Sequence, residues 1–290
     1  MRSFEGKRCL ITGAGSGIGK ATAEAVAREG GQLVLTDINE TALGETVRGI
    51  RESGGRVLAA QALDISDYQA VKAFAKAWHH THGSLDVVMN IAGISIWGEV
   101  EHLQHQDWRD ALEVNLMGPI HVIECFLPPM IDAGRGGHLV NVSSAAGLFG
   151  LAWHAPYSAS KFGLRGISEV LRFDLEQHGI GVSLVCPGGV DTGLVNTVRI
   201  AGVDSESPTM VKMRERFRKH AVSPEQAARA ILKGVKRNRY LVFTSRDIRI
   251  GHWLQRRCHW LYVLIMRRIS RQMQAVAARS RLPRAEGEDS

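Results

Sequence analysis

The stretch Thr12-Gly13-Ala14-Gly15-Ser16-Gly17-Ile18-Gly19 decides the fold of this chain of 290 residues. A β-rich run precedes it and a helix-like segment follows it. Glycines adopt backbone angles that other residues resist, and they let a phosphate approach bare N–H groups. The helix N-terminus adds about half a positive charge at the same place. The G-x-x-x-G-x-G spacing at this first strand-to-helix turn therefore predicts a dinucleotide phosphate site built from Gly13, Ser16, Gly17, Ile18 and Gly19.

Outward from this loop, strand-like and helix-like segments alternate along the chain. The β-rich runs are 8–12, 33–37, 57–62, 85–90, 138–142 and 181–186, and the helix-like segments are 18–28, 40–52, 67–80, 106–130 and 157–177. Such alternation indicates βαβ crossovers and a parallel sheet that helices cover on both faces. We expect an α/β fold with a doubly wound, Rossmann-like sheet in a single domain.

The expected domain comprises residues 1–243 and includes a substrate lid at about 193–222, where Met210 and Met213 stand among basic residues. A basic, partly apolar helical extension, 244–290, follows it. Residues 285–290 are expected to form a disordered polar end. The extension has a tract, 258–266, that is apolar but too short to span a membrane.

Composition limits the function classes. Apolar residues make up 44% of the chain and charged residues 22%, which excludes global disorder. No run approaches the ~20 apolar residues of a membrane span, and the β-rich run that begins near Lys7 leads us to expect no signal peptide. The four cysteines are far apart, so we expect no metal site, no disulfide framework and a reducing, cytoplasmic location.

The acidic residue at the end of the second strand indicates which dinucleotide binds. Asp37 stands eighteen residues beyond Gly19, where a carboxylate accepts hydrogen bonds from an adenosine ribose. The same charge repels a 2′-phosphate, and Ile38 follows it instead of a basic residue. We therefore expect the cofactor to be NAD and not NADP. The alternative is that Asp37 only caps the next helix.

A second group of residues has the chemistry of proton transfer. Tyr157 and Lys161 are four residues apart at the start of an expected helix and so share one face. An ammonium beside a phenol lowers the pKa of the phenol, which is near 10 in the free side chain. Ser143 and Ser144 end the preceding strand, at the edge where a parallel sheet binds ligands.

With these motifs in order, the sequence resembles the short-chain dehydrogenase/reductase family from about residue 5 to residue 192. The matching stretches are 12–19, Asn90-Ile91-Ala92-Gly93, Asn115, Ser144, Tyr157 to Lys161, and Pro187-Gly188. The thirteen-residue step from Ser144 to Tyr157 also matches, and it selects Ser144 over Ser143. Ile91 is a departure, because the family often has a second Asn there.

The resemblance implies four catalytic residues. Tyr157 would be the general acid/base, Lys161 would lower its pKa and hold the nicotinamide ribose, and Ser144 would steady the substrate oxygen. Asn115 would hold a water that links Lys161 to solvent. Asp64 would contact adenine and Thr192 the carboxamide, while the other residues implied to border the cofactor are Ile65, Asn90, Ala92, Gly93, Pro187, Gly188 and Val190.

The loops after the sheet's ligand-binding edge are rich in apolar residues. The eight positions that we expect to line a substrate pocket include no Arg or Lys. We expect a lipophilic secondary alcohol or ketone, such as a steroid, a retinoid or a long-chain compound. The alternative is that some of these residues belong to the core. The expected pocket residues are Ile94, Ile96, Trp97, Leu148, Phe149, Trp153, Val190 and Val195.

The net charge of +7 raises the question of anionic partners. The bases follow no nucleic-acid-binding motif, so we expect no nucleic acid. Arginines flank the apolar tract, which is consistent with peripheral contact with an anionic membrane. However, Arg257 and Arg268 fall among its apolar side chains, which slightly favours an arm that packs on its own domain or on a second subunit.

The sequence as a whole favours an NAD-dependent oxidoreductase that assembles as a homodimer or homotetramer. The alternative is a non-catalytic NAD-binding or membrane-surface scaffold with the same fold. Binding alone does not need Asn115, Ser144, Tyr157 and Lys161 together, and this argues against the alternative.

Overall fold

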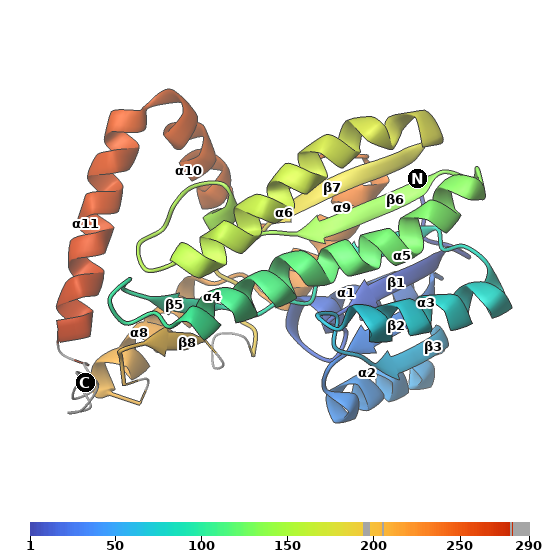
Figure 1. The fold of residues 1–290 in the computed structure, drawn as a ribbon, viewed down its shortest axis with the longest axis horizontal. Helices are drawn as coiled ribbons and strands as arrows, with labels where there is room; N and C mark the ends of the chain where they lie inside the picture. Colours follow the sequence, from blue (N-terminus) through green and yellow to red (C-terminus); the bar gives the residue numbers. More distant parts are fainter. Residues whose placement is uncertain (194–197, 205, 279, 281–290) are drawn as a thin grey trace.

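A parallel sheet forms the centre of the computed structural model, which describes residues 1–193, 198–204, 206–278 and 280. Its seven strands lie in the order β3-β2-β1-β4-β6-β7-β9, and every neighbouring pair is parallel (Figure 1). The strands are β1 (Arg8–Thr12), β2 (Gln32–Asp37), β3 (Arg56–Ala62), β4 (Val87–Asn90), β6 (Gly137–Val142), β7 (Ile180–Cys186) and β9 (Leu241–Phe243). This topology confirms the predicted doubly wound fold.

Helices cover both faces of the sheet because successive strand residues point to opposite sides. Ile11, Leu33 and Val140 pack on one side with helices α1 (Gly17–Arg28), α2 (Glu40–Glu52) and α9 (Pro224–Lys236). Leu10, Val34 and Leu139 pack on the other side. There they meet α3 (Tyr68–His82), α5 (Gly118–Asp132) and the C-terminal end of α6 (Ala155–Asp174).

Local sequence sets where these helices begin. Asn39 caps α2 by accepting a hydrogen bond from the Ala42 amide, and Asp67 caps α3 by accepting from two amides. Ser223 and Gln226 form a capping box at the start of α9. α3 ends at Gly83, whose positive φ of 73° is costly for residues with a side chain. Helices α2 and α3 thus lie close to the predicted limits, 40–52 and 67–80.

The chain reverses its direction of travel across the sheet at β1. It moves outward from β1 to β2 and β3, and then returns to place β4 on the other side of β1. Ligands of open α/β sheets bind outside the carboxyl ends of the strands at such a switch point. The ends of β1 and β4 therefore locate the candidate site.

One predicted helix, 106–130, is interrupted. Helix α4 (His105–Leu112) passes into α5 through one π-helical turn, Glu113–Met117. Among the described residues, 105–132 forms one helix long and apolar enough to cross a membrane by length and composition, with mean hydropathy 1.3 and 44% of that window buried. Val122, Phe126, Leu127 and Met130 of this helix pack on the sheet.

Three strands were not predicted. The edge strand β9 pairs with β7, and β5 (Ile96–Gly98) pairs with β8 (Arg199–Ala201) in a separate two-stranded sheet. Arg199 forms ion pairs with Asp107 and Asp110 of α4, so the small sheet is attached to the main body. Helix α8 (Pro208–His220) follows β8 and packs through Met210 against Trp153.

The C-terminal extension is helical, in agreement with the expectation, and consists of α10 (Arg246–Arg257) and α11 (His259–Ala278). The two helices form an arm that projects beside the carboxyl edge of the sheet, and α11 returns toward α8 (Figure 1). Val195 and the expected polar end 285–290 lie outside the described residues. The lid boundaries stay a prediction.

Candidate active site

The glycine loop between β1 and α1 is held by close backbone packing. A Cβ on Gly13 would lie 2.8 Å from Ala92 Cα, and one on Gly19 would lie 1.9 Å from the Gly13 carbonyl oxygen. Gly13 and Gly17 also have positive φ angles, 69° and 51°. Ser16 precedes α1 without a side-chain cap, which leaves the amides of its first turn to bind an anion. The loop thus fits a phosphate.

Asp37, at the end of β2, lies beside this loop. Its carboxylate accepts hydrogen bonds from the Gly15 amide at 2.8 Å and the Asn39 amide at 2.9 Å. The side chain therefore both fixes the loop and places a negative charge next to it. The next residue, Ile38, is exposed. Its side chain is apolar and therefore offers no positive charge to offset Asp37.

The end of β4 is joined to β1 and β6 by polar side chains. Thr12 Oγ1 accepts hydrogen bonds from the amides of Ile91 and Ala92 at 3.0 and 3.1 Å. Asn90 donates to Asn141 Oδ1 at 2.9 Å, and its own buried Oδ1 has no partner among the described residues. An unpartnered buried acceptor at this edge is available to a ligand or a water.

Lys161 lies in the same region. Its Nζ donates to the Val142 carbonyl at 3.1 Å, and the side chain is buried. Burial lowers the pKa of Lys161 from 10.5 to about 8. A Cβ on Gly93 would lie 2.8 Å from Asn115 Oδ1 and 3.3 Å from Lys161 Nζ, so both side chains pack closely against this glycine.

Ser144 and Tyr157 face each other across the carboxyl edge of the sheet. Burial raises the pKa of Tyr157, while a hydrogen bond from Ser144 lowers it. Ser144 Oγ also accepts a hydrogen bond from the Ala146 amide at 3.1 Å, which fixes the hydroxyl. Lys161 Nζ is 5.7 Å from the centre of the Tyr157 ring. The structure thus brings three of the four predicted catalytic residues together.

Asn115, the fourth, is fully buried in the π-helical turn. Its Oδ1 accepts from the Ile94 amide at 2.9 Å, and its Nδ2 donates to the Ile94 carbonyl at 3.0 Å and to Ser160 Oγ at 3.3 Å. Ser160 in turn donates to the Tyr157 carbonyl at 2.7 Å. Ser160 was not predicted from the sequence, although it stands between Tyr157 and Lys161, because its contact with Asn115 depends on the fold.

The remaining predicted cofactor residues lie around the same edge. Asp64 is exposed after β3, whereas the Ile65 side chain is buried beneath Gly118. The Pro187 carbonyl accepts from the Ala145 amide at 2.8 Å, which joins the loops after β6 and β7. Gly188 packs against α10, Val190 bridges to Val222, and Thr192 lies over Gly17. The roles of these residues stay predictions.

His154 is a further residue beside Tyr157 and lies outside the motifs described for the sequence. Its ring is 6.2 Å from the Tyr157 ring and 4.3 Å from that of Trp97. Nδ1 bonds with the Ala152 carbonyl at 2.6 Å, and burial lowers the pKa of His154. A neutral ring therefore stands beside the phenol at neutral pH.

Two of the expected pocket residues belong to the core. Leu148 and Phe149 are buried and pack with Leu184, Cys186 and Ile248. Hydrophobic contact with β7 and α10 explains this placement. Trp153 and Trp97 join a separate apolar cluster with Met210. A cleft of about 380 Å³ opens between this region and α11, and Gly98, Leu151, Trp153, Ser158 and Gln274 are among its lining residues.

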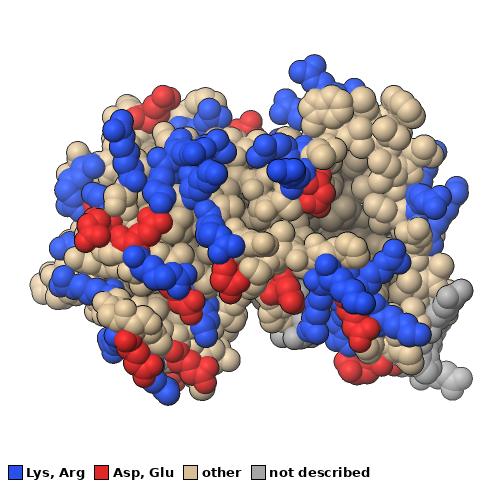
Figure 2. Space-filling view, turned by 180° about the vertical axis from the view of Figure 1, so that it is seen from behind, with Lys and Arg blue, Asp and Glu red and all other residues tan. Residues whose placement is uncertain are grey.

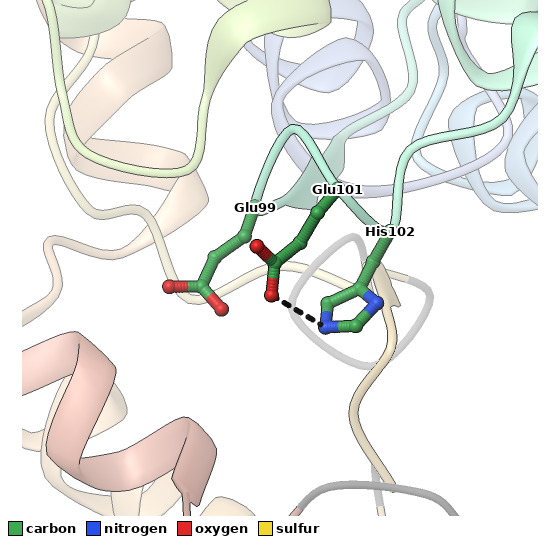
Figure 3. Close-up of side chains that lie close together, drawn as sticks. All are labelled: Glu99, Glu101 and His102. Carbon is green, nitrogen blue, oxygen red and sulfur yellow. Dashed lines mark ion pairs between the residues drawn. The ribbon is translucent and has the colours of Figure 1, made fainter. Parts of the chain in front are cut away.

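Glu99 stands at the rim of this cleft, close to Glu101 and His102. Glu99, Glu101 and His102 bring potential ligand atoms within 4.8 Å of one another, and Figure 3 shows the two carboxylates on the turn that follows β5. His102 Nε2 is 3.5 Å from Glu101 Oε1. This ion pair accounts for the approach of two of the three side chains, and we assign no metal role to them.

Known proteins similar to this chain were found by sequence. Residues 7–201 match the family described as short chain dehydrogenase. A putative oxidoreductase of Mycobacterium tuberculosis, SadH, is 35% identical over 85% of this chain and 89% of its own length. The probable oxidoreductase EphD of the same species is 36% identical over 79% of this chain. The match covers only 39% of EphD, so the chain spans about two fifths of that protein.

Solved structures give the same result. A short chain dehydrogenase/reductase from Burkholderia phymatum in complex with NAD has a TM-score of 0.79 and 31% identity, covering 90% of this chain and 96% of its own. A metagenomic short-chain oxidoreductase in complex with NADP has a TM-score of 0.65 and 31% identity, covering 84% and 93%. Proteins similar to this chain thus bind either dinucleotide.

Proposed function

Because the chain belongs to the short-chain dehydrogenase/reductase family of oxidoreductases, we propose that it transfers hydride between NAD and the carbinol carbon of a lipophilic secondary alcohol. The observation that carries this proposal is the grouping of Ser144, Tyr157 and Lys161 at the carboxyl edge of the sheet. When bound, NAD supplies the hydride acceptor for alcohol oxidation and the hydride donor for ketone reduction.

Side chains of the protein transfer the proton and bind the substrate oxygen. In oxidation the Tyr157 phenolate takes the hydroxyl proton, and in reduction the phenol returns it to the carbonyl oxygen. Ser144 donates a hydrogen bond to that oxygen and steadies it. The pKa of Tyr157 must fall for this role, although burial raises it. The nearby Lys161 ammonium is the source of positive charge that favours the phenolate.

Asp37 supports NAD as the dinucleotide. Its carboxylate, fixed by the Gly15 and Asn39 amides, lies beside the glycine loop where an adenosine ribose would be held. Two unit charges 4 Å apart repel by about 4 kcal/mol at an effective dielectric constant of 20. The 2′-phosphate of NADP would be repelled by Asp37, and the next residue, Ile38, has no positive charge to offset this repulsion.

The apolar surroundings of the site support a lipophilic substrate. The Trp97 and His154 rings contact each other at a tilt of 35° next to Tyr157, and burial lowers the pKa of His154, which disfavours a positive charge there. The cleft toward α11 has Glu99 at its rim, and this carboxylate disfavours anionic substrates. We propose a steroid-like, retinoid-like or long-chain secondary alcohol or ketone.

A screen of such alcohols with NAD, read by the absorbance of the reduced cofactor, tests the proposal. Tyr157→Phe keeps the ring but removes the proton donor, so turnover should fall to near background while NAD still binds. Tyr240→Phe is the matched control, because the Tyr240 hydroxyl has no partner among the described residues. Retention of more than about a tenth of normal turnover in Tyr157→Phe would contradict the acid/base role. NAD binding without any turnover would favour the scaffold alternative.

A further inference from the structure

The corner where α10 meets α11 exposes large apolar side chains that no part of the described chain covers. Trp260 is 72% exposed, Trp253 57% and Leu264 59%, and Ile250 and Ile265 are exposed as well. Trp260 and Leu264 are four residues apart and so share one face of α11. Figure 2 shows the lobe formed by these helices, at upper right, as a mainly uncharged surface with basic groups along its edges.

The opposite face of α11 is already occupied by the protein's own domain. Tyr262 donates a hydrogen bond to the Gly150 carbonyl at 2.9 Å, and its ring meets the edge of Phe149. Met273 and Val276 pack with the apolar cluster around Trp153. Positions 262, 273 and 276 follow helical spacing on one face. The arm is therefore fixed to the domain, and the Trp260–Leu264 face is a separate outer surface.

The charge of the arm is almost entirely positive. Residues 246–278 contain seven arginines and one acidic residue, Asp247. Five of the arginines border the exposed apolar corner, and none of them forms an ion pair with another described residue: Arg256, Arg257, Arg267, Arg268 and Arg271. Arginine binds phosphate and carboxylate groups through its planar fork of donors.

We propose that this corner is a docking surface for an anionic lipid bilayer. Tryptophan and leucine side chains bury apolar area at the boundary between headgroups and acyl chains, where the indole N–H still reaches polar partners. The arginines then meet the phosphates and carboxylates of the headgroups. Arg257 and Arg268 interrupt the apolar tract in the sequence, yet at a bilayer surface long arginine side chains extend to the headgroups.

Charge complementarity selects a bilayer over a second copy of the chain. A two-fold contact places the same surface of both copies face to face. Such a contact would bring the five arginines of one copy against the same five of the other, with no acidic residues to pair them. An anionic bilayer supplies the opposite charge.

Sedimentation of the full chain with vesicles tests the proposal. Phosphatidylcholine vesicles containing roughly 30% phosphatidylserine should bind the protein, and pure phosphatidylcholine should bind it far less. Binding should weaken as added salt shortens the Debye length from about 30 Å to about 8 Å. Absence of binding to the serine-lipid vesicles, or binding that salt does not weaken, would overturn the proposal.

Arginine variants test whether vesicle binding depends on the arginines of this corner or only on the total positive charge of the protein. Arg267→Gln with Arg268→Gln should weaken partitioning about 25-fold, at about fivefold for each basic residue. Arg48→Gln with Arg51→Gln removes the same charge from the exposed face of α2, which lies at the far end of the molecule (Figure 1). This control should leave partitioning within about twofold. Equal losses in the two variants would overturn the proposal.

Apolar variants test insertion. Trp260→Ser with Leu264→Ser should weaken partitioning by at least about tenfold, whereas Trp260→Phe with Leu264→Met should stay within about threefold. Thermal unfolding and NAD binding report whether each variant is folded. If the serine variant keeps full vesicle binding, or instead changes the oligomeric state in light scattering, lipid is not what covers this face.

Discussion

At the scale of single residues, the burial of Lys161 in the site lowers the stability of the fold. Its amine is buried and has one hydrogen bond within the described chain, to the Val142 carbonyl. Burial disfavours the charged form, and this lowers the pKa to about 8. A charged Lys161 amine is therefore held in the folded chain at the expense of folding stability near neutral pH.

This cost predicts a particular dependence of stability on pH. The pKa of Lys161 is about 8 in the folded chain and 10.5 as the ordinary value. Between these values the unfolded chain binds more protons, so the free energy of unfolding rises with pH by up to about 1.4 kcal/mol per unit. The gain is complete above 10.5 and is lost as the pH falls through 8.

Urea unfolding of the native chain and of Lys161→Met over this pH range measures the effect. The methionine variant cannot titrate at this position, so the native chain should gain stability relative to it as the pH rises. A difference between the two that is independent of pH would contradict the burial effect.

A second prediction at this scale concerns Asp37. Asp37→Asn keeps a hydrogen-bond acceptor for the loop but removes the charge, and Ile38→Arg adds a partner for a 2′-phosphate. The ratio of kcat/KM for NADP to that for NAD should rise by roughly 100-fold, which is less than the unscreened repulsion because the site is partly exposed. Ile38→Arg alone, which keeps the carboxylate, should change the ratio much less. A native chain that already prefers NADP would show that Asp37 does not set the choice.

At the scale of elements, helix positions group the predicted catalytic side chains. The start of α6 presents Tyr157 and Lys161 on one face, and the π-helical turn before α5 holds Asn115 against Ile94. The loop after β6 presents Ser144 and then continues to Phe149 and Gly150, where α11 is attached. The arm is thus connected through one loop to Ser144, the predicted catalytic serine.

The Tyr262 hydroxyl gives a test of this connection. Tyr262→Phe keeps the ring packing on Phe149 but removes the hydrogen bond to the Gly150 carbonyl. Stability should fall by about 1 kcal/mol or less, because the bond is partly exposed. Hydrogen exchange should become faster in α11 and in the loop at 147–151. Exchange that is faster throughout the sheet instead would indicate global destabilisation.

The central elements were predictable from the sequence because each strand is a short β-rich run between glycine turns and helix caps. β1 has the predicted limits, and β6 begins one residue earlier than expected, at Gly137. β5, β8 and β9 were missed because three-residue strands carry too little periodic signal. The π-helical turn could not be predicted from the sequence either, because its side-chain pattern continues that of the flanking helices.

The roles of Ser144, Tyr157 and Lys161 stay predictions, but the grouping of these side chains was predictable from the sequence because chemistry and spacing coincide there. Contacts that depend on the fold were not. Ser160 has an ordinary identity, and only the structure shows that it bonds with Asn115. Likewise, the sequence could not show that Phe149 packs against α10 while the Trp97 ring contacts that of His154.

At the scale of the whole molecule, a face of α6 remains exposed on the side away from the sheet. Phe162, Val170 and Phe173 lie along one stripe of the helix, and all three are exposed. A contiguous exposed apolar patch is a feature of protein interaction sites. We propose that a second copy covers it in the predicted homodimer or homotetramer.

Light scattering of charge variants tests this assembly. Val170→Glu with Phe173→Glu should convert the native oligomer to a smaller species, because two-fold contact would bring like charges together. Val100→Glu, in an exposed turn after β5, is the control and should leave the mass unchanged. A native chain that is monomeric at micromolar concentration would contradict the proposal.

The edge strand β9 has a consequence for how the chain is made. It pairs with β7, yet Leu241 follows Cys186 by 55 positions. Translation at about 5–20 residues per second leaves β7 as an open edge for about 3–11 s after its synthesis. Nascent chains are prone to aggregate through such edges. The arm is translated later still, so the proposed lipid-binding corner reaches the ribosome exit only after every strand of the sheet has been synthesised.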